Sequence, residues 1–326
     1  MAAIDAFMAD PHCQVFNLFG LAGTGKTTLL VHVAHQYDHS VLCSLTGKAA
    51  SVLRRKTGLS ACTLHSYFYR LREAQKDRRG RDVLLFQRQY RRDALTGDLA
   101  LLDESSMIAE DIGRDLIDTG TKIITSGDPG QLQPVKGARF FDRADFTLTE
   151  IHRQALESPI IRQAHVVRGG GNYAEDGPAF RIVHGGSDDD LREADVVLCW
   201  TNKTKDKLNA MCRRVRGLWQ PGPQPGEPLV CLKNAAAFGV FNGGVYTLLQ
   251  PFLQGDASIT LDVDGRAVTI PHARFKGLLS SLPEHVEATT EFDFGYAMTV
   301  HKAQGSEWPF VVVALWLSTI VSASLA

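Results

Sequence analysis

The sequence predicts an α/β protein built on parallel sheets and divided into two domains, and three observations carry this prediction. Apolar runs typical of buried strands recur at 13–19, 40–45 and 98–102, each followed by a polar turn. The first run leads into a glycine-rich turn and then a helix, the order expected in a parallel sheet. The length of 326 residues is sufficient for two domains with separate cores.

The glycine-rich turn at residues 20–27 matches G-x-x-x-x-G-K-[ST] between a strand and a helix. Such a turn directs backbone N–H groups and a helix N-terminus into one concavity, which suits a phosphate. We expect Lys26 to reach the β- and γ-phosphates and Thr27 to bind Mg²⁺. A glycine-rich turn without a ligand is the alternative, disfavoured because every fixed position is filled. The predicted nucleotide-binding residues of this loop are Gly20, Ala22, Gly23, Thr24, Gly25, Lys26, Thr27 and Thr28.

The composition is that of an ordinary globular protein, with 44% hydrophobic and 22% charged residues and a net charge of −1. Any nucleic-acid surface must therefore be local. Six scattered cysteines without a C-x-x-C pair indicate reduced thiols, and we expect a cytoplasmic protein. The apolar segment 308–326 raises the question of a membrane span, but its β-branched centre favours a buried strand, so we expect no membrane partner.

One segment is strongly basic. Residues 70–92 hold nine arginines and lysines against three acidic residues, interleaved with aromatic side chains. This pattern suits a phosphate backbone and its stacked bases, and we favour single-stranded DNA as the partner. A solvated charged helix is the alternative interpretation.

Polar residues follow further strand-like runs. Asp103 and Glu104 end the run 98–102, and this pair suits Mg²⁺ coordination by Asp103 and water orientation by Glu104. Gln131 follows the run 122–125, where a polar side chain can sense a γ-phosphate. An Asp-Glu pair is also a common helix cap. Because this pair comes after the phosphate loop in the sequence, we favour a catalytic role for it.

The order of these motifs resembles that of superfamily 1 helicases, most closely the RecD-like and Dda-like branch. Residues 20–27 resemble the Walker A motif and 103–107 the Walker B motif. Residues 127–135 are similar to the motif that couples ATP to DNA, although Gln133 stands where the family usually has proline. Residues 299–307, Thr-Val-His-Lys-Ala-Gln-Gly-Ser-Glu, resemble motif V and argue against a metabolic P-loop kinase.

The resemblance implies two RecA-like P-loop NTPase domains and an ATP- and Mg²⁺-dependent helicase or translocase that moves 5′ to 3′ on single-stranded DNA. Lys26, Glu104 and Gln131 would be catalytic, with Arg153 as an arginine finger from the second motor domain. Thr27 and Asp103 would hold the metal, and Gly305 and Glu307 would face the nucleotide. The implied DNA-binding residues are Thr46, Lys48, Thr63, His65, Asn202, Thr299 and His301.

We place the first motor domain at 1–150, with its basic insertion at about 67–97, and the second at 151–326. Alternating runs and the hairpin signals Asn242-Gly243 and Asp264-Gly265 predict a β insertion at about 226–290. The resemblance implies an SH3-like subdomain that grips single-stranded DNA. A purely structural insertion is the alternative.

The sequence departs from the family pattern at both ends. The family has a glutamine motif upstream of the helix in which this sequence begins, and a final motif with a Thr-Arg pair. No arginine follows the strand-like run at 310–315. Because loss of one transition-state arginine can slow phosphoryl transfer by about 10³-fold, the alternative function is a truncated relative that binds ATP and single-stranded DNA without unwinding.

Overall fold

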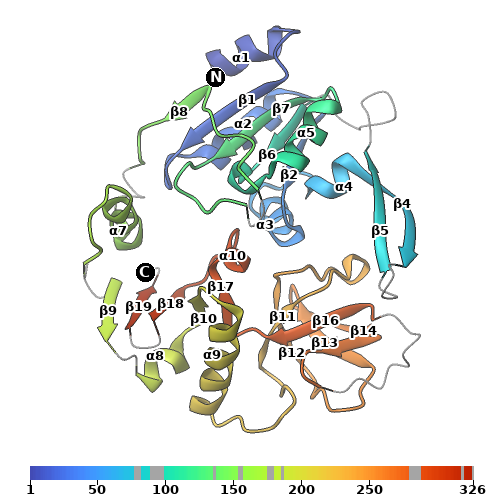
Figure 1. The fold of residues 1–326 in the computed structure, drawn as a ribbon, viewed down its shortest axis with the longest axis vertical. Coiled ribbons are helices and arrows are strands. Elements are labelled where there is room, and N and C mark those ends of the chain that lie inside the picture. The colour runs from blue at the N-terminus through green and yellow to red at the C-terminus, as the bar shows by residue number, and fades with distance from the viewer. Residues whose placement is uncertain are drawn as a thin grey trace. The chain divides into compact units, whose positions relative to one another are not determined.

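The computed structural model shows two compact units, Met1–Glu157 and Ser158–Ala326 (Figure 1). It describes residues 1–76, 82–88, 99–134, 137–152, 157–174, 180–184, 187–278, 288–316 and 319–324. The boundary between the units lies after Glu157, whereas the sequence-based division was placed after residue 150. Each unit has its own sheets and its own hydrophobic cores.

The first unit is built on a six-stranded sheet in the order β3-β2-β6-β7-β1-β8, in which every neighbouring pair is parallel. All four residues of β6 are buried, as expected for a strand covered on both faces. The strands are β1 (Val15–Gly20), β2 (Ser40–Ser44), β3 (Ala61–Thr63), β6 (Leu99–Leu102), β7 (Lys122–Gly127) and β8 (Phe146–Leu148).

Helices cover both faces of this sheet, and the alternation along β6 shows how. Leu99 and Leu101 pack in one core with residues of α1, α2 and α3. Ala100 and Leu102 point to the opposite face and pack in a second core with residues of α4 and α5. The helices are α1 (Ala2–Ala9), α2 (Lys26–Gln36), α3 (Gly47–Thr57), α4 (Leu64–Phe68) and α5 (Glu110–Asp118), and a 3₁₀ turn, η2 (Ser105–Met107), follows β6.

Parallel pairing has one consequence for function. All six strands run the same way, so the loops that follow them emerge at one edge of the sheet. The phosphate loop, the Asp103-Glu104 pair and the segments after β2, β3, β7 and β8 therefore share that edge.

The basic segment contains an antiparallel pair of strands, β4 (Tyr69–Lys76) and β5 (Asp82–Arg88). The alternative of a charged helix is thus wrong for these strands. Residues 77–81 and 89–98, which carry many of the arginines, lie outside the described residues. The predicted contact of this segment with single-stranded DNA stays a prediction.

The second unit contains a mixed sheet in the order β17-β10-β18-β19-β9. β10 is parallel to β17 and β18, and β19 is antiparallel to β18 and β9. The strands are β9 (Phe180–His184), β10 (Val196–Cys199), β17 (Ala297–Thr299), β18 (Phe310–Trp316) and β19 (Thr319–Ser324). The helices are α7 (Pro159–Arg168), α8 (Asp188–Glu193), α9 (Asn202–Val215) and α10 (Val300–Ala303).

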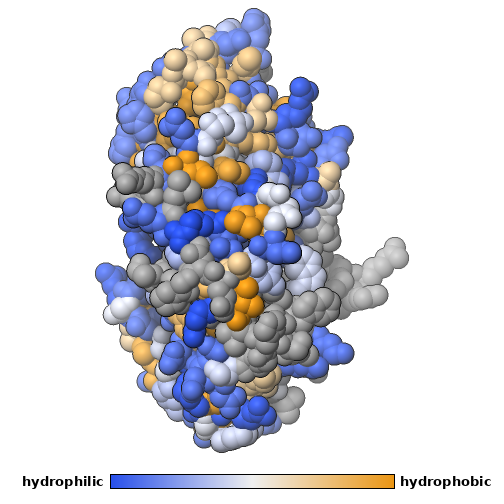
Figure 2. All heavy atoms as spheres, turned by 90° about the vertical axis from the view of Figure 1, so that its left-hand side faces the viewer, coloured by the Kyte–Doolittle hydropathy of each residue, from blue (hydrophilic) through white to orange (hydrophobic). Residues whose placement is uncertain are grey.

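The apolar C-terminal segment forms strands β18 and β19, as its β-branched centre indicated. Among the helices of the described residues, none combines the length and apolar character that a membrane crossing requires. On the face drawn in Figure 2, hydrophobic residues gather in the upper part, and smaller groups lie among hydrophilic residues below.

A six-stranded sheet, β14-β13-β12-β11-β16-β15, forms the β insertion of the second unit. Asp264 and Gly265 connect β13 to β14 with positive φ angles, so this hairpin prediction is confirmed. Asn242-Gly243 instead lies in the longer connection 232–244 between β11 and β12, which also holds a 3₁₀ turn, η3 (Ala236–Phe238). The strands are β11 (Pro228–Cys231), β12 (Val245–Leu248), β13 (Ser258–Val263), β14 (Arg266–Pro271), β15 (Ala273–Phe275) and β16 (Thr290–Phe294).

Helix α9 is tied to this insertion by buried polar contacts. Arg213 and Glu227, 8% and 1% exposed, form two hydrogen bonds of 2.8 and 3.1 Å between guanidinium and carboxylate. Asn209 is also buried: its Nδ2 donates to the Phe294 carbonyl and its Oδ1 accepts from the Ala297 amide. Its side chain thus ties α9 to strands β16 and β17.

Replacing Glu227 by alanine should strongly destabilise the second unit, because the buried Arg213 guanidinium would lose its carboxylate. We expect a loss of about 3 to 5 kcal/mol in the free energy of unfolding, measured by chemical denaturation. The matched control is Asp189→Ala, which breaks a solvent-exposed pair with Arg192 and should change little. Equal unfolding midpoints for the two variants would contradict this assignment.

Candidate functional site

The phosphate loop joins β1 to α2 through backbone conformations that favour glycine. Gly23 and Gly25 have φ angles of 81° and 80°, in the left-handed region. A Cβ atom on Gly25 would lie 2.8 Å from Nε2 of His152. Because Gly25 has no side chain to cap α2, the first N–H groups of the helix are left for a ligand.

Lys26 already holds its ammonium group at this loop. Its Nζ donates hydrogen bonds of 2.9 Å to the carbonyl oxygens of Gly20 and Leu21. Thr24 closes the same turn through a bond of 2.8 Å from its hydroxyl to the Leu21 carbonyl. The remaining predicted contacts of the loop, Ala22, Thr27 and Thr28, are exposed.

Asp103 connects three segments at the sheet edge. Its Oδ2 accepts a bond of 3.1 Å from the Thr27 hydroxyl, and its Oδ1 accepts bonds from the Ser126 hydroxyl at 2.6 Å and the Glu104 amide at 3.0 Å. Mg²⁺ binds oxygen ligands at about 2.1 Å in octahedral geometry, so neighbouring ligands stand about 3 Å apart. The Thr27 and Asp103 oxygens therefore fit the predicted metal site.

Glu104 is held in an unusual environment. Its φ angle of 58° is rare for a residue other than glycine. Burial and the neighbouring Asp103 raise the pKa of its carboxyl group to about 7, with Lys26 acting in the opposite direction. Strain and a perturbed pKa at one residue are features of functional sites.

Gln131 belongs to a loop fastened to the segment after β6. The Ser106 hydroxyl donates to the Asp128 carbonyl and accepts from the Asp128 amide, both at 3.0 Å. Arg139 donates to the carbonyls of Ser106 and Gln131, at 3.1 and 3.0 Å. The backbone around Gln131 is thus fixed, while its side chain is exposed.

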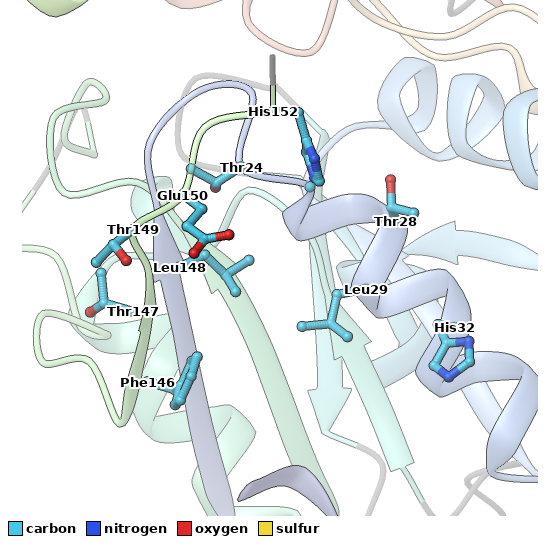
Figure 3. Close-up of a pocket in the computed structure, with 11 residues that line it drawn as sticks. Thr24, Thr28, Leu29, His32, Phe146, Thr147, Leu148, Thr149, Glu150 and His152 are labelled. Atoms are coloured by element: carbon cyan, nitrogen blue, oxygen red, sulfur yellow. The ribbon is translucent and has the colours of Figure 1, made fainter. Parts of the chain in front are cut away.

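A pocket of about 590 Å³ lies beside the phosphate loop, between α2 and β8 with the segment that follows β8 (Figure 3). Leu29, Phe146 and Leu148 provide apolar surface, and Glu150 and His152 provide polar groups. The His152 amide donates a bond of 3.0 Å to the Gly23 carbonyl. Arg153, the predicted arginine finger, is the next residue and lies outside the described residues.

His32 also lines this pocket, on α2. In the described parts of the chain, no group of three or more His, Cys, Asp or Glu side chains could hold a metal ion.

The predicted DNA-binding residues of the first unit follow β2 and β3. Thr46 and Thr63 cap α3 and α4, each accepting a bond of 3.1 Å from a backbone amide. Burial, with a contribution from Arg55, lowers the pKa of Lys48 to about 8. His65 stacks on Tyr69 at a ring distance of 5.4 Å, and its partial burial lowers its pKa. Both threonines therefore have a structural role whatever they bind.

The predicted residues of the second unit gather at the ends of β10 and β17. Asn202 is the first residue of α9, and Thr299 stands at the start of α10, before His301. Gly305 has a φ angle of 72°, and Glu307 is exposed. The roles of Gly305 and Glu307 toward the nucleotide stay predictions.

Several residues of these sites were not found from the sequence. Ser126, which supports Asp103, ends a strand, and its place beside Asp103 at the shared edge was the available signal. His152, which lines the pocket, directly precedes the predicted arginine finger Arg153 in the sequence. Trp200 directly follows β10, and no motif in the sequence marks it.

An all-parallel sheet whose first strand leads into a phosphate loop, with an aspartate from a neighbouring strand bonded to the loop's threonine, defines a P-loop nucleotide-binding protein. The sequence profile described as "AAA domain" matches residues 1–176, and the chain belongs to this family. A profile of the UvrD-like helicase C-terminal domain matches residues 294–316.

Curated relatives include the ATP-dependent RecD2 DNA helicase of Deinococcus radiodurans, 29% identical over 332 residues, or 91% of this chain and 42% of that helicase. The conjugal transfer protein TraA of Rhizobium radiobacter is 28% identical, over 97% of this chain and 30% of TraA. The chain thus spans less than half the length of these relatives.

Solved structures share the fold. Pif1 helicase from Bacteroides, in complex with ADP-AlF3 and ssDNA, superposes with a TM-score of 0.60 at 20% identity, covering 96% of this chain and 85% of that one. Pif1 helicase from Candida albicans gives a TM-score of 0.52 at 18% identity, covering 92% and 84%. The α/β fold of two RecA-like units and the resemblance to RecD-like superfamily 1 helicases are confirmed.

The raised pKa of Glu104 predicts a pH-dependent change in stability. Its folded pKa of about 7 lies above the unfolded value of about 4.5, so the folded state favours the protonated carboxyl. Glu104 therefore contributes to the stability of the folded state fully below pH 4.5, and this stabilisation is lost as the pH rises to about 7. At pH 8 without nucleotide, Glu104→Gln should therefore raise the free energy of unfolding by on the order of 1 to 3 kcal/mol.

The measurement is chemical denaturation of the first unit at pH 5 and pH 8. Glu110→Gln, at the exposed start of α5, is the control. A gain for Glu104→Gln that is equal at both pH values would contradict the predicted titration.

Proposed function

We propose that this chain is an ATP-dependent DNA helicase that couples ATP hydrolysis to movement along single-stranded DNA. One observation carries the proposal. The phosphate loop with Asp103 and Glu104 occupies the same sheet edge as the segments that hold Lys48 and His65. A change around the nucleotide can therefore reach the DNA-binding segments through one rigid sheet.

ATP would be held mainly by the loop backbone and Lys26. Its phosphates would replace the carbonyl oxygens of Gly20 and Leu21 as partners of the ammonium group. Thr27 and Asp103 would hold Mg²⁺, which when bound neutralises charge on the phosphate oxygens. Ionised Glu104 would orient the attacking water and accept its proton.

The pocket beside the loop would accept the base of the nucleotide. Its apolar walls, Leu29, Phe146 and Leu148, suit the faces of an aromatic ring. Glu150 and His152 provide polar groups for the ring edge. The bond between His152 and Gly23 fixes this wall relative to the phosphate loop.

Gln131 would connect hydrolysis to DNA. Its loop is bonded through Ser106 and Arg139 to the segment that carries Asp103 and Glu104. A shift of the catalytic segment on release of phosphate would therefore be passed to the Gln131 loop. Discrete rearrangements of this kind drive conformational switching in nucleotide-dependent proteins.

The relatives named as helicases support this proposal, and the structural resemblance to Pif1 supports single-stranded DNA as the ligand. We propose movement from 5′ to 3′, as the family resemblance implies. The test is ATP hydrolysis with and without single-stranded DNA, followed by unwinding of duplexes with either a 5′ or a 3′ tail. Nucleotide and DNA binding without stimulated hydrolysis would reject the motor function.

Lys26→Ala should reduce DNA-stimulated ATP hydrolysis by about 10²-fold or more, because the phosphates lose their cation. A phosphate-release assay measures this effect. Lys207→Ala, at an exposed position of α9, is the control for removing a lysine and should hydrolyse ATP normally. Normal turnover in Lys26→Ala would disprove the assignment of the site.

Lys48 should make DNA binding pH-dependent. Only its protonated form attracts a phosphate, and its pKa of about 8 lies within the usual assay range. Affinity for single-stranded DNA should fall by up to about tenfold between pH 7 and pH 9. Lys48→Arg should remove this fall, because arginine stays charged.

Fluorescence anisotropy with a labelled oligonucleotide gives the affinities at each pH. Lys56→Arg, on the same helix, is the control and should keep the wild-type pH dependence. If the DNA affinity of Lys48→Arg fell with pH as steeply as that of wild type, Lys48 would not be the group whose charge contacts the DNA.

A further inference from the structure

Trp200 presents most of its side chain to solvent at the carboxyl end of β10. It is 66% exposed, and its ring lies 5.4 Å from that of His301, tilted by 59°. We propose that Trp200 and His301 form a stacking site for an unpaired nucleobase of single-stranded DNA. This inference rests on the proposed function and assigns Trp200 a role in it.

The sheet register brings the two rings together. β10 and β17 are parallel neighbours, with Cys199 opposite Thr299. Trp200 therefore leaves the sheet at the same edge as the segment that carries His301. Two segments about one hundred residues apart in the sequence thus meet at this site.

Groups that can contact a phosphate directly follow Trp200 in the sequence. Thr201 caps the fourteen-residue helix α9 through a bond of 3.1 Å from the Thr204 amide. Asn202 and Lys203, exposed at the start of this helix, provide an amide and a positive charge. A stacking surface beside a cation and a helix N-terminus matches the alternating bases and phosphates of a single strand.

The support beneath the rings is rigid. Lys205 of α9 is buried and bonds Asp293 of β16 at 2.5 Å. Asn209 of the same helix bonds the backbone of Phe294 and Ala297. These contacts fix α9 relative to the strand that leads to His301, so a base would meet a preformed surface and little entropy would be lost on binding.

The surroundings favour a nucleobase over a docked protein. Of the described residues 196–204 and 297–303, Trp200 is the only large hydrophobic side chain that is mostly exposed. Protein interfaces have a wider apolar centre than one ring. A single aromatic pair among polar groups instead suits one planar base, whose faces are apolar and whose edges are polar.

The test compares binding of oligothymidylate with binding of an abasic strand of the same length, by anisotropy at fixed salt. Trp200→Ala should weaken binding of oligothymidylate by about 5- to 100-fold, the range for loss of one base–aromatic stack. Its affinity for the abasic strand should stay at the wild-type value. Trp200→Phe should keep most of the preference for bases. The control is Trp219→Ala, which removes a tryptophan that is 72% exposed on the α9–β11 connection. Its affinities for oligothymidylate and for the abasic strand should both equal those of wild type.

A fluorescence readout tests the contact itself. Oligothymidylate should quench the tryptophan emission of wild type and Trp219→Phe, and should quench Trp200→Phe much less. Equal binding of oligothymidylate by wild type and Trp200→Ala would overturn the stacking site while leaving the proposed function intact. An equal loss on both strands, or a lowered melting temperature, would also overturn it by assigning Trp200 a structural role. Failure of wild type to bind either strand would instead reject the proposed function.

Discussion

The hydrogen bonds received by the Asp103 carboxylate organise the first unit. Its donors are the Thr27 hydroxyl, the Ser126 hydroxyl and the Glu104 amide, which belong to the phosphate loop, the end of β7 and the segment after β6. One side chain thus joins its own segment to two segments that are distant in the sequence. This is possible because every strand of the sheet points the same way, so that the loops reach a common edge.

Glu104 shows what this arrangement costs. Its backbone has a left-handed φ angle, and its carboxyl group is buried next to Asp103. Both features disfavour the folded state with an ionised side chain. Two apolar cores on the faces of the sheet stabilise the unit against this cost. The candidate site thus places backbone strain and buried charge at the sheet edge, while the apolar cores on the two faces of the sheet provide the stability.

Local patterns predicted the fold class, the phosphate loop and the Asp103-Glu104 pair, because each is encoded within a few consecutive residues. Contacts between distant segments were not predictable in the same way. Nothing in the spacing of Arg213 and Glu227 shows that they pair across a proline-rich turn, or that Asn209 fixes the start of β17. Residue type alone also could not separate two roles for Thr46 and Thr63, since the hydroxyl that would contact DNA is the one that caps a helix.

The bonds from Lys26 to the two loop carbonyls tie the ammonium group to the backbone of its own loop, at 2.9 Å from each oxygen. The position of the charge is therefore set by the backbone, and the long side chain has already lost much of its rotamer freedom. Ordering a flexible lysine side chain costs up to about 2 kcal/mol, and a polyphosphate bound here would avoid most of that cost. The loop is thus preorganised by its own cation as well as by its glycines.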